Sequence, residues 1–269
     1  MAAIANPTIM PRFGFGTDKT TKDAVLVALK AGYRLIDTAR VYVDSEVNVG
    51  NAIRESGLNR NEIYITTKII PEKHDQVFET VEESLKALQT DYIDLLLLHG
   101  AHPEQEKRLS MYKDLIALKE AGKIESFGVS NFNVAQLEEI RLEELPKPAV
   151  NQLEIHPLCQ HRVIVPYCQD HSIIVQAYCP IMRGTAGEHA EIRALADKYD
   201  RDPSQIVLRW SHQKGFVPLP KSNTPARIIS NSRIFDFELT PEDIGKLDAL
   251  DRGKKGSFIN PKHYPADTP

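Results

Sequence analysis

The sequence has few cysteines, and only Cys159, Cys168 and Cys179 occur among its 269 residues. Their number is odd and no two of them form a C-x-x-C pair, which argues against a disulfide framework. Proteins that use cysteine in this way are typical of a reducing compartment. We therefore expect a cytoplasmic protein.

Long apolar runs and an excess of charge of one sign are also lacking. Apolar stretches such as 93–98 are far shorter than the roughly 20 residues of a membrane helix, and no basic region followed by an apolar one opens the chain. The formal net charge of -4 gives no electrostatic case for binding nucleic acid or an anionic membrane. We expect neither a membrane nor a nucleic acid as a partner.

No Ser/Gly linker, low-complexity tract or repeat of fixed period divides the chain, so we expect one domain over residues 1–269. Short, mainly apolar runs alternate with segments of helical spacing, and a further helix over 203–213 interrupts the alternation before the last run. The expected strands are 13–17, 33–37, 63–68, 92–99, 124–131, 149–154, 173–178 and 216–222, and the clearest other helices are 21–31, 76–88, 109–121 and 190–199.

This alternation predicts the α/β class and a single (β/α)8 TIM barrel with extra helices and an irregular C-terminal tail. Such barrels commonly use about 250 residues as one domain, which fits the length of this chain. The tail over 253–269 carries two glycines and several prolines. It either folds over the mouth of the barrel or is an ordinary loose terminus, and the sequence leaves both open.

Polar side chains end three successive strands of the expected barrel. Asp37 ends the second strand, Lys68 the third and His99 the fourth, and Tyr42 follows in the loop after Asp37. Each of them alone has an ordinary explanation, such as a turn former or a solvated strand end. Because barrel enzymes keep their sites at the C-terminal ends of the strands, the four together predict a catalytic cluster.

The chemistry of this cluster centres on a phenol. A tyrosine with a pKa near 10 is a weak acid-base catalyst at neutral pH. We expect Lys68, itself held by Asp37, to favour the phenolate and lower the pKa of Tyr42. His99 then donates to a substrate oxygen on which negative charge develops.

Motifs that run in order along nearly the whole chain resemble those of the aldo-keto reductases. They are GYRLIDTA at 32–39 with Tyr42 and VG at 49–50, ITTK at 65–68, LLLLH at 95–99, GVSNF at 128–132, NQ at 151–152 with Glu154 and HP at 156–157, and LPKS at 219–222. The resemblance implies an NADPH-dependent reduction of an aldehyde or ketone, with Tyr42, Asp37, Lys68 and His99 as the catalytic residues and Tyr42 as the general acid.

The resemblance also implies a binding site for NADPH or NADP+. Ser130, Asn131 and Gln152 match residues that bind the nicotinamide carboxamide, and Tyr178 matches the aromatic ring that stacks on it. Lys221, Ser222 and Arg227 match residues that grip the 2'-phosphate, where positive charge is required, and Asn231 matches an adenine contact. Gly16, Thr17 and Asp37 complete the expected cofactor residues.

The chain departs from the family pattern around the substrate. Asp18, Ile70 and Gly100 stand where aromatic residues are common in aldehyde-reducing members. We place these residues and Val41 in the substrate pocket, which should be wider and less aromatic, with a polar feature at its entrance. Arg183, in the loop that lines the pyrophosphate in the family, either contacts the cofactor or faces solvent.

Several other interpretations remain open at this stage. The glycines in 13–17 lack the strand-turn-helix setting of a dinucleotide fingerprint and are expected to pack closely within the barrel. His99 and His102 lack a third ligand of suitable spacing, so we predict no metal. Alternatives to the reductase are an NADPH-binding regulatory or scaffold subunit and a Schiff-base aldolase with Lys68 as nucleophile. We expect a small carbonyl compound as the partner and a chain that is a monomer or a weak dimer.

Overall fold

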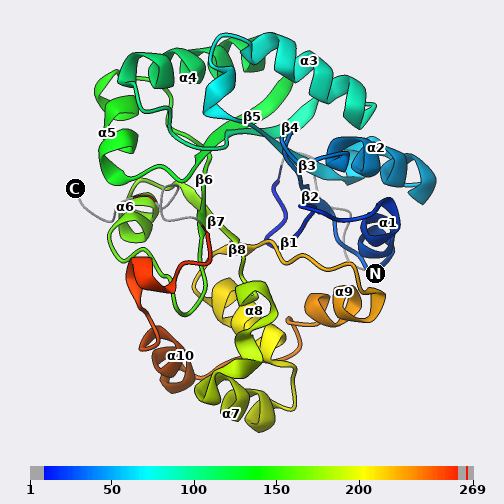
Figure 1. The fold of residues 1–269 in the computed structure, drawn as a ribbon, viewed down its shortest axis with the longest axis vertical. Coiled ribbons are helices and arrows are strands. Elements are labelled where there is room, and N and C mark those ends of the chain that lie inside the picture. Colours follow the sequence, from blue (N-terminus) through cyan, green and yellow to red (C-terminus); the bar gives the residue numbers. More distant parts are fainter. Residues whose placement is uncertain (1–8, 260–264, 266–269) are drawn as a thin grey trace.

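The computed structural model of the protein describes residues 9–259 and residue 265. Eight parallel strands lie side by side in sequence order, and helices cover the outside of this sheet (Figure 1). The predicted (β/α)8 barrel is therefore confirmed. The strands are β1 (Gly14–Gly16), β2 (Leu35–Asp37), β3 (Tyr64–Ile69), β4 (Ile93–Leu98), β5 (Ile124–Ser130), β6 (Val150–Glu154), β7 (Ile174–Tyr178) and β8 (Val217–Pro218).

The helices follow the strands in turn, and two of them, α7 and α8, lie between β7 and β8 as predicted. They are α1 (Lys22–Lys30), α2 (Ser45–Ser56), α3 (Val77–Leu88), α4 (Gln105–Glu120), α5 (Val134–Leu142), α6 (Ile164–Asp170), α7 (Ala190–Tyr199), α8 (Pro203–Gln213), α9 (Pro225–Ser232) and α10 (Pro241–Asp248). Short 3-10 helices are η1 (Arg60–Glu62), η2 (Pro71–Lys73), η3 (Met182–Gly184), η4 (Ala186–Glu188) and η5 (Gly253–Gly256). No helix of the described part is long and apolar enough to cross a membrane.

The barrel is nearly closed between its last and first strands. β8 is much shorter than the expected strand 216–222, because Pro218 and Pro220 have no amide hydrogen to donate to a neighbouring strand. The Gly16 amide still donates to the Pro220 carbonyl at 3.0 Å and joins β1 to the segment after β8. The other seven strands agree with the prediction to within two residues at each end.

Successive residues of each strand alternate between the inside of the barrel and its helical cover. Leu95 and Leu97 of β4 pack inside with Leu35 and Val150, whereas Leu96 and Leu98 belong to the layer between the strands and the helices. Met10 joins the inner cluster. Because this alternation continues to the C-terminal ends, the polar residues there also point into the barrel.

Two sequence expectations about local packing have different outcomes. A side chain at Gly14 would lie 2.6 Å from Leu35 Cγ, so this glycine packs closely in the barrel as predicted.

The start of α4 was predicted at residue 109 and lies at Gln105. Its first turn is charged and is stabilised by a 2.7 Å ion pair between Lys107 and Glu104, and the apolar pattern begins only later.

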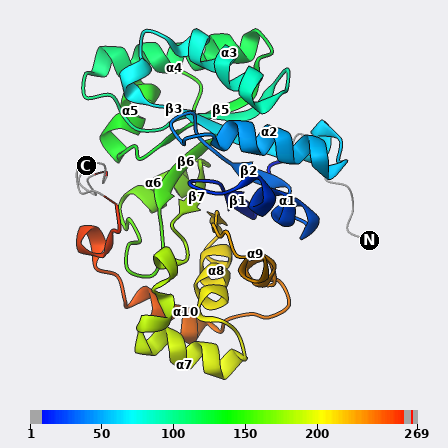
Figure 2. The same cartoon turned by 45° about the vertical axis from the view of Figure 1, so that its right-hand side comes forward.

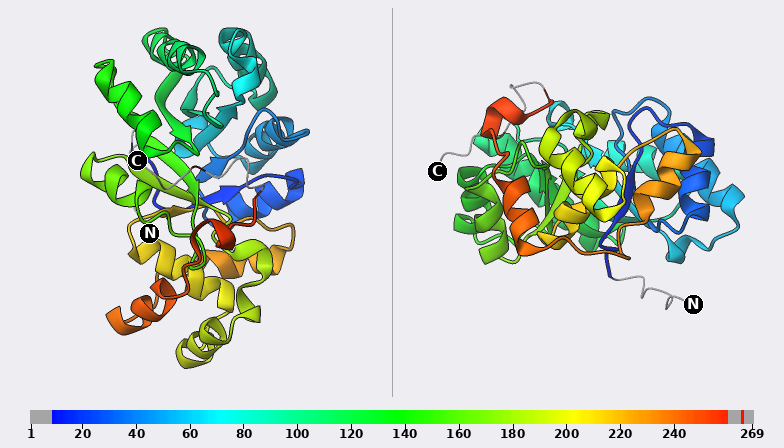
Figure 3. Two further views of the ribbon diagram at one scale, coloured as in Figure 1. Left: turned by 60° about the vertical axis from the view of Figure 1, so that its left-hand side comes forward. Right: turned by 90° about the horizontal axis from the view of Figure 1, so that it is seen from below.

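The chain after α10 returns along α6 and the loop before it (red in Figures 2 and 3). The Asp251 carboxylate bonds Arg162 at 2.5 Å, and the Arg252 amide donates to the Leu158 carbonyl at 2.9 Å. Gly256 packs so tightly that an added Cβ would lie 1.9 Å from the same carbonyl oxygen. These contacts bring residues 251–259 back to the barrel.

Candidate active site

A cleft of about 1550 Å³ opens at the C-terminal ends of the strands, where a barrel enzyme binds its ligands. Every predicted site residue except Lys68 lines it. These are Gly16, Thr17, Asp18, Asp37, Val41, Tyr42, Ile70, His99, Gly100, Ser130, Asn131, Gln152, Tyr178, Lys221, Ser222, Arg227 and Asn231. Residues from distant parts of the sequence therefore meet in one place, as the strand ends predicted.

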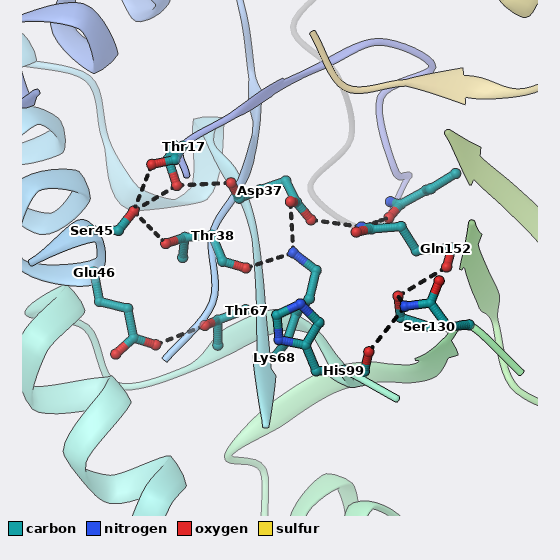
Figure 4. A network of polar contacts seen from close by, with 12 residues as sticks. Thr17, Asp37, Thr38, Ser45, Glu46, Thr67, Lys68, His99, Ser130 and Gln152 are labelled. Carbon is teal, nitrogen blue, oxygen red and sulfur yellow. Dashed lines mark hydrogen bonds and ion pairs between the residues drawn. The ribbon is translucent and has the colours of Figure 1, made fainter. Parts of the chain in front are cut away.

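Lys68 lies beneath the floor of this cleft, and its side chain has no exposed area. Its Nζ donates to Asp37 Oδ1 at 2.7 Å and to the Thr38 carbonyl at 2.8 Å (Figure 4). The other oxygen of Asp37 accepts from Gln152 Nε2, also at 2.7 Å. A buried charge is costly unless it is paired and hydrogen-bonded, and here both members of the pair meet that condition.

The Tyr42 ring lies beside this pair and beside His99. Lys68 Nζ is 5.4 Å from the centroid of the Tyr42 ring. The rings of Tyr42 and His99 are 5.7 Å apart at an interplanar angle of 79°. The structure thus brings the four predicted catalytic residues together, with Tyr42, His99 and Asp37 lining the cleft and Lys68 buried beneath its floor.

The prediction that the pKa of Tyr42 is lowered was wrong. Burial, followed by the negative charges of Asp37 and Asp18, raises the pKa of Tyr42 above its usual value. Lys68 does not offset this rise, because Asp37 lies 2.7 Å from its ammonium group and balances its charge. Tyr42 is therefore held as a protonated phenol at neutral pH, which is the form that can give a proton away.

Three hydroxyl groups that sequence reasoning did not single out as a group hold the loop that carries Tyr42. Ser45 Oγ, at the start of α2, lies 2.7 Å from Thr17 Oγ1 and accepts from Thr38 Oγ1 at 2.8 Å (Figure 4). The Thr17 hydroxyl also bonds the Asp37 carbonyl at 2.9 Å. The backbone on both sides of Tyr42 is thus tied to β1 and β2.

A buried carboxylate supports the same loop from the helical side. Glu46 is 2% exposed, accepts from Thr67 Oγ1 at 2.7 Å and lies 3.5 Å from Arg40 Nη1. In the sequence, the signal for these supporting residues was a pair of adjacent polar residues, Ser45 and Glu46, near the start of a helix. Sequence alone does not show that they face inward.

On the other side of the cleft, amide and hydroxyl groups form a connected set. Asn131 has a left-handed backbone (φ 60°) and donates from Nδ2 to the His99 carbonyl at 3.2 Å and to Ser130 Oγ at 3.1 Å. Its Oδ1 accepts from the Tyr178 hydroxyl at 2.9 Å, which fixes that ring at the wall of the cleft. Gln152 Nε2 also donates to Gln176 Oε1 at 2.8 Å.

The far end of the cleft is lined by the segment before α9, which carries Lys221, and by the start of α9, which carries Arg227. Lys221 and Arg227 form no salt bridge with any carboxylate of the described residues, so their charges remain available to an anion. The Thr224 amide donates to Ser222 Oγ at 3.0 Å, and Arg227 Nη2 donates to Thr224 Oγ1 at 2.8 Å. This set fits a phosphate group at the start of a helix.

The four residues predicted for the substrate pocket, Asp18, Val41, Ile70 and Gly100, line this cleft. Asp18 and Val41 are exposed, and a Cβ at Gly100 would meet only Pro71, at 3.7 Å. Ser230, which also lines the cleft, donates to the Asp202 carboxylate at 2.5 Å. Ile259 of the C-terminal segment also lines the cleft. The sequence had left open whether this tail folds over the mouth of the barrel.

Lys68 and His102 belong to two alternatives that the sequence raised, a Schiff-base aldolase and a metal site. A Schiff-base nucleophile needs a neutral amine open to the substrate, whereas Lys68 is fully buried and bonded to Asp37. His102 Nδ1 accepts from the Glu104 amide at 3.0 Å at the start of α4. No group of three or more His, Cys, Asp or Glu among the described residues could hold a metal ion.

A phenol, an imidazole and a lysine-aspartate pair lie at one end of the cleft, and two cations that form no salt bridge with the described carboxylates lie at the other. This arrangement fits a reductase with a phosphorylated nicotinamide cofactor. The chain belongs to the aldo/keto reductase family, whose sequence model matches residues 12–252. It is an NADP(H)-dependent oxidoreductase that reduces an aldehyde or ketone to an alcohol. The family predicted from the motifs is confirmed.

Relatives in sequence and structure cover nearly the whole chain. Methylglyoxal reductase DkgA of Escherichia coli (strain K12) is 38% identical over 94% of this chain and 96% of its own length. Glyoxal reductase of Bacillus subtilis (strain 168) is 40% identical over 93% and 92%. A Bombyx mori aldo-keto reductase in complex with NADP has a TM-score of 0.85 at 34% identity, covering 95% of this chain and 94% of that chain.

Proposed function

We propose that Tyr42 protonates the carbonyl oxygen of the substrate while His99 donates to or orients the same oxygen. NADPH supplies the hydride when it is bound. The observation that carries this proposal is the convergence of the Tyr42 and His99 rings, 5.7 Å apart, above the buried pair of Lys68 and Asp37. Because Tyr42 is held protonated, the proton is in place before charge develops on the oxygen.

The cofactor residues have separate roles in this proposal. Ser130, Asn131 and Gln152 bind the nicotinamide carboxamide, and Tyr178 stacks on the ring from the position at which Asn131 holds it. Gly16, Thr17 and Asp37 line the same cleft. Lys221, Ser222 and Arg227 bind the 2'-phosphate, and Asn231 contacts the adenine. Among the described residues neither Lys221 nor Arg227 has a carboxylate partner, which supports NADPH over NADH.

The preference for NADPH gives a direct test of the phosphate site. Replacing Arg227 with alanine removes a charge-assisted hydrogen bond to the 2'-phosphate, so we expect the Kd for NADPH to rise about tenfold or more. The Kd for NADH should stay within about twofold, because NADH lacks this phosphate. Fluorescence titration measures both. Arg233→Ala, at the other end of α9, is the matched control, and equal losses for both cofactors would remove Arg227 from the phosphate site.

We propose small uncharged α-dicarbonyl compounds as the substrates. Two relatives are named as methylglyoxal and glyoxal reductases. The cleft beside Tyr42 is lined by Asp18 and Glu72, whose negative charges disfavour a carboxylate on the substrate. NADPH consumption with methylglyoxal, glyoxal, phenylglyoxal and 2-keto acids tests the proposal, and a preference for the 2-keto acids would contradict it.

Asp18 should set part of this charge preference. Changing Asp18 to asparagine removes one negative charge at the entrance, so we expect kcat/KM for a 2-keto acid to rise about threefold, as expected for unit charges a few ångströms apart in water. The value for methylglyoxal should not change. Steady-state kinetics measure both ratios. Asp23→Asn on α1, outside the cleft, is the control, and the same gain in that variant would assign the effect to overall charge.

A further inference from the structure

The C-terminal segment 257–259 lies against the mouth of the barrel, and Ile259 and Pro265 line the cleft. Residues 260–264 are outside the described part of the chain. The sequence left open whether the tail covers the active site. The contacts of residues 257–259 show which side chain holds this segment at the mouth of the barrel.

One buried carboxylate accepts hydrogen bonds from three consecutive residues of this segment. Glu154, the last residue of β6, is 1% exposed. It accepts from Ser257 Oγ at 2.5 Å, from the Phe258 amide at 2.6 Å and from the Ile259 amide at 3.4 Å. On the barrel side, His156 Nε2 lies 3.1 Å from Glu154 Oε1. More than a hundred residues separate Glu154 from the segment that it binds.

The carboxylate and the segment depend on one another energetically. An ionised carboxylate buried without donors is costly, and most of the donors to Glu154 come from 257–259. Although burial raises it, the bonds from His156, Ser257 and Phe258 hold the pKa of Glu154 below its usual value. The charge therefore persists at neutral pH and holds the segment with charge-assisted bonds.

The position of Glu154 connects the segment to the catalytic end of the cleft. Glu154 and Gln152 are two residues apart on β6 and so point to the same side of the strand. In the sheet Glu154 is paired with Tyr178, whose hydroxyl donates to Asn131, and Asn131 bonds the His99 carbonyl. A shift of the segment would therefore also displace groups next to the proposed nicotinamide site.

We propose that Glu154 is a positioning residue that seats 257–259 so that Ile259 forms an apolar wall of the substrate end of the cleft. This inference rests on the proposed function. Small dicarbonyl compounds turn over without reaching this wall, whereas a larger apolar carbonyl compound packs against it. Glu154 thus controls which substrates are held well and takes no part in the proton or hydride transfer.

The test replaces Glu154 with glutamine, which keeps the shape but presents an amide donor to the donors of the segment. We expect the KM for phenylglyoxal to rise about fivefold, from lost apolar contact with Ile259, while the KM for methylglyoxal and both kcat values stay within about twofold. Ile259→Ala should give the same pattern, and the double variant should be no worse than either single one. Glu125→Gln, on the exposed face of β5, is the matched control.

Two further measurements keep the inference testable if Glu154→Gln folds poorly or turnover is absent. Ser257→Ala removes one bond and keeps the carboxylate, so it should shift the KM for phenylglyoxal in the same direction by a smaller factor. Hydrogen exchange at the Phe258 and Ile259 amides should speed up at least about tenfold in both variants and needs no substrate.

The outcomes separate this inference from the proposed function. If wild-type protein reduces no carbonyl compound, the proposed function fails, and amide exchange still reports on the segment. Unchanged exchange in the Glu154 and Ser257 variants would overturn the inference. So would additive effects of Glu154→Gln and Ile259→Ala on the KM for phenylglyoxal, or equal effects on both substrates.

Discussion

Replacing Tyr42 with phenylalanine should lower kcat for carbonyl reduction by about 100- to 10,000-fold, the usual contribution of a general acid. The change removes one oxygen atom and leaves the ring that packs 5.7 Å from His99. The Kd for NADPH should therefore stay within about twofold, because the phenol oxygen is not among the proposed cofactor contacts. Single-turnover oxidation of bound NADPH with methylglyoxal measures the chemical step, and fluorescence titration measures the affinity.

The control for this experiment is another half-buried tyrosine of the barrel. Tyr64, the first residue of β3, lies at the opposite end of the strands from the cleft, and Tyr64→Phe should reduce methylglyoxal at the wild-type rate. Turnover by the Tyr42 variant close to wild type would remove Tyr42 as the acid. A joint loss of turnover and NADPH binding would point instead to a disturbed cleft.

The barrel and the position of the catalytic cluster could be predicted because they follow from local patterns. Asp37, Lys68 and His99 each end an apolar run, and parallel strands bring their C-terminal ends to one edge. The length of β8 was the exception. An apolar run over 216–222 suggested a strand, while its two prolines leave only Val217–Pro218 in the sheet.

The supports of the site could not be predicted because they depend on contacts between distant segments. Ser45 meets Thr17 from 28 residues away, and Glu154 meets Ser257 from 103 residues away. Nothing in the local sequence shows that these groups face inward or toward each other. Such residues hold the loop of Tyr42 and the segment of Ile259 in place.

The predicted direction of the pKa shift at Tyr42 was wrong for a related reason. The sequence showed a cation near the phenol but not how completely Asp37 would balance it. In the structure Lys68 gives its hydrogen bonds to Asp37 and to the Thr38 carbonyl, so burial decides the pKa of Tyr42. The ion pair therefore shapes the floor of the site rather than making the phenol more acidic.

This structural role of the ion pair predicts that removing one of its members has a second large effect, on stability as well as activity. Replacing Lys68 with methionine keeps the volume of the side chain but leaves Asp37 buried with Gln152 as its remaining side-chain donor. Breaking one side of a buried pair typically costs about 3–5 kcal/mol, and we expect a loss of this size in the free energy of unfolding. Activity should fall as well, because Asp37 and Gln152 lie beneath the reacting groups. Urea unfolding and methylglyoxal kinetics measure the two losses.

A double variant distinguishes the cost of an unpaired charge from a general loss of packing. With Asp37→Asn added to Lys68→Met, neither charge of this buried pair remains, so most of the lost unfolding free energy should return. Activity should stay low, because neither the ammonium group nor the carboxylate that orders Gln152 is restored. If the double variant is no more stable than Lys68→Met alone, the buried charge is not the source of the loss. If it regains activity, the ion pair has no part in arranging the site.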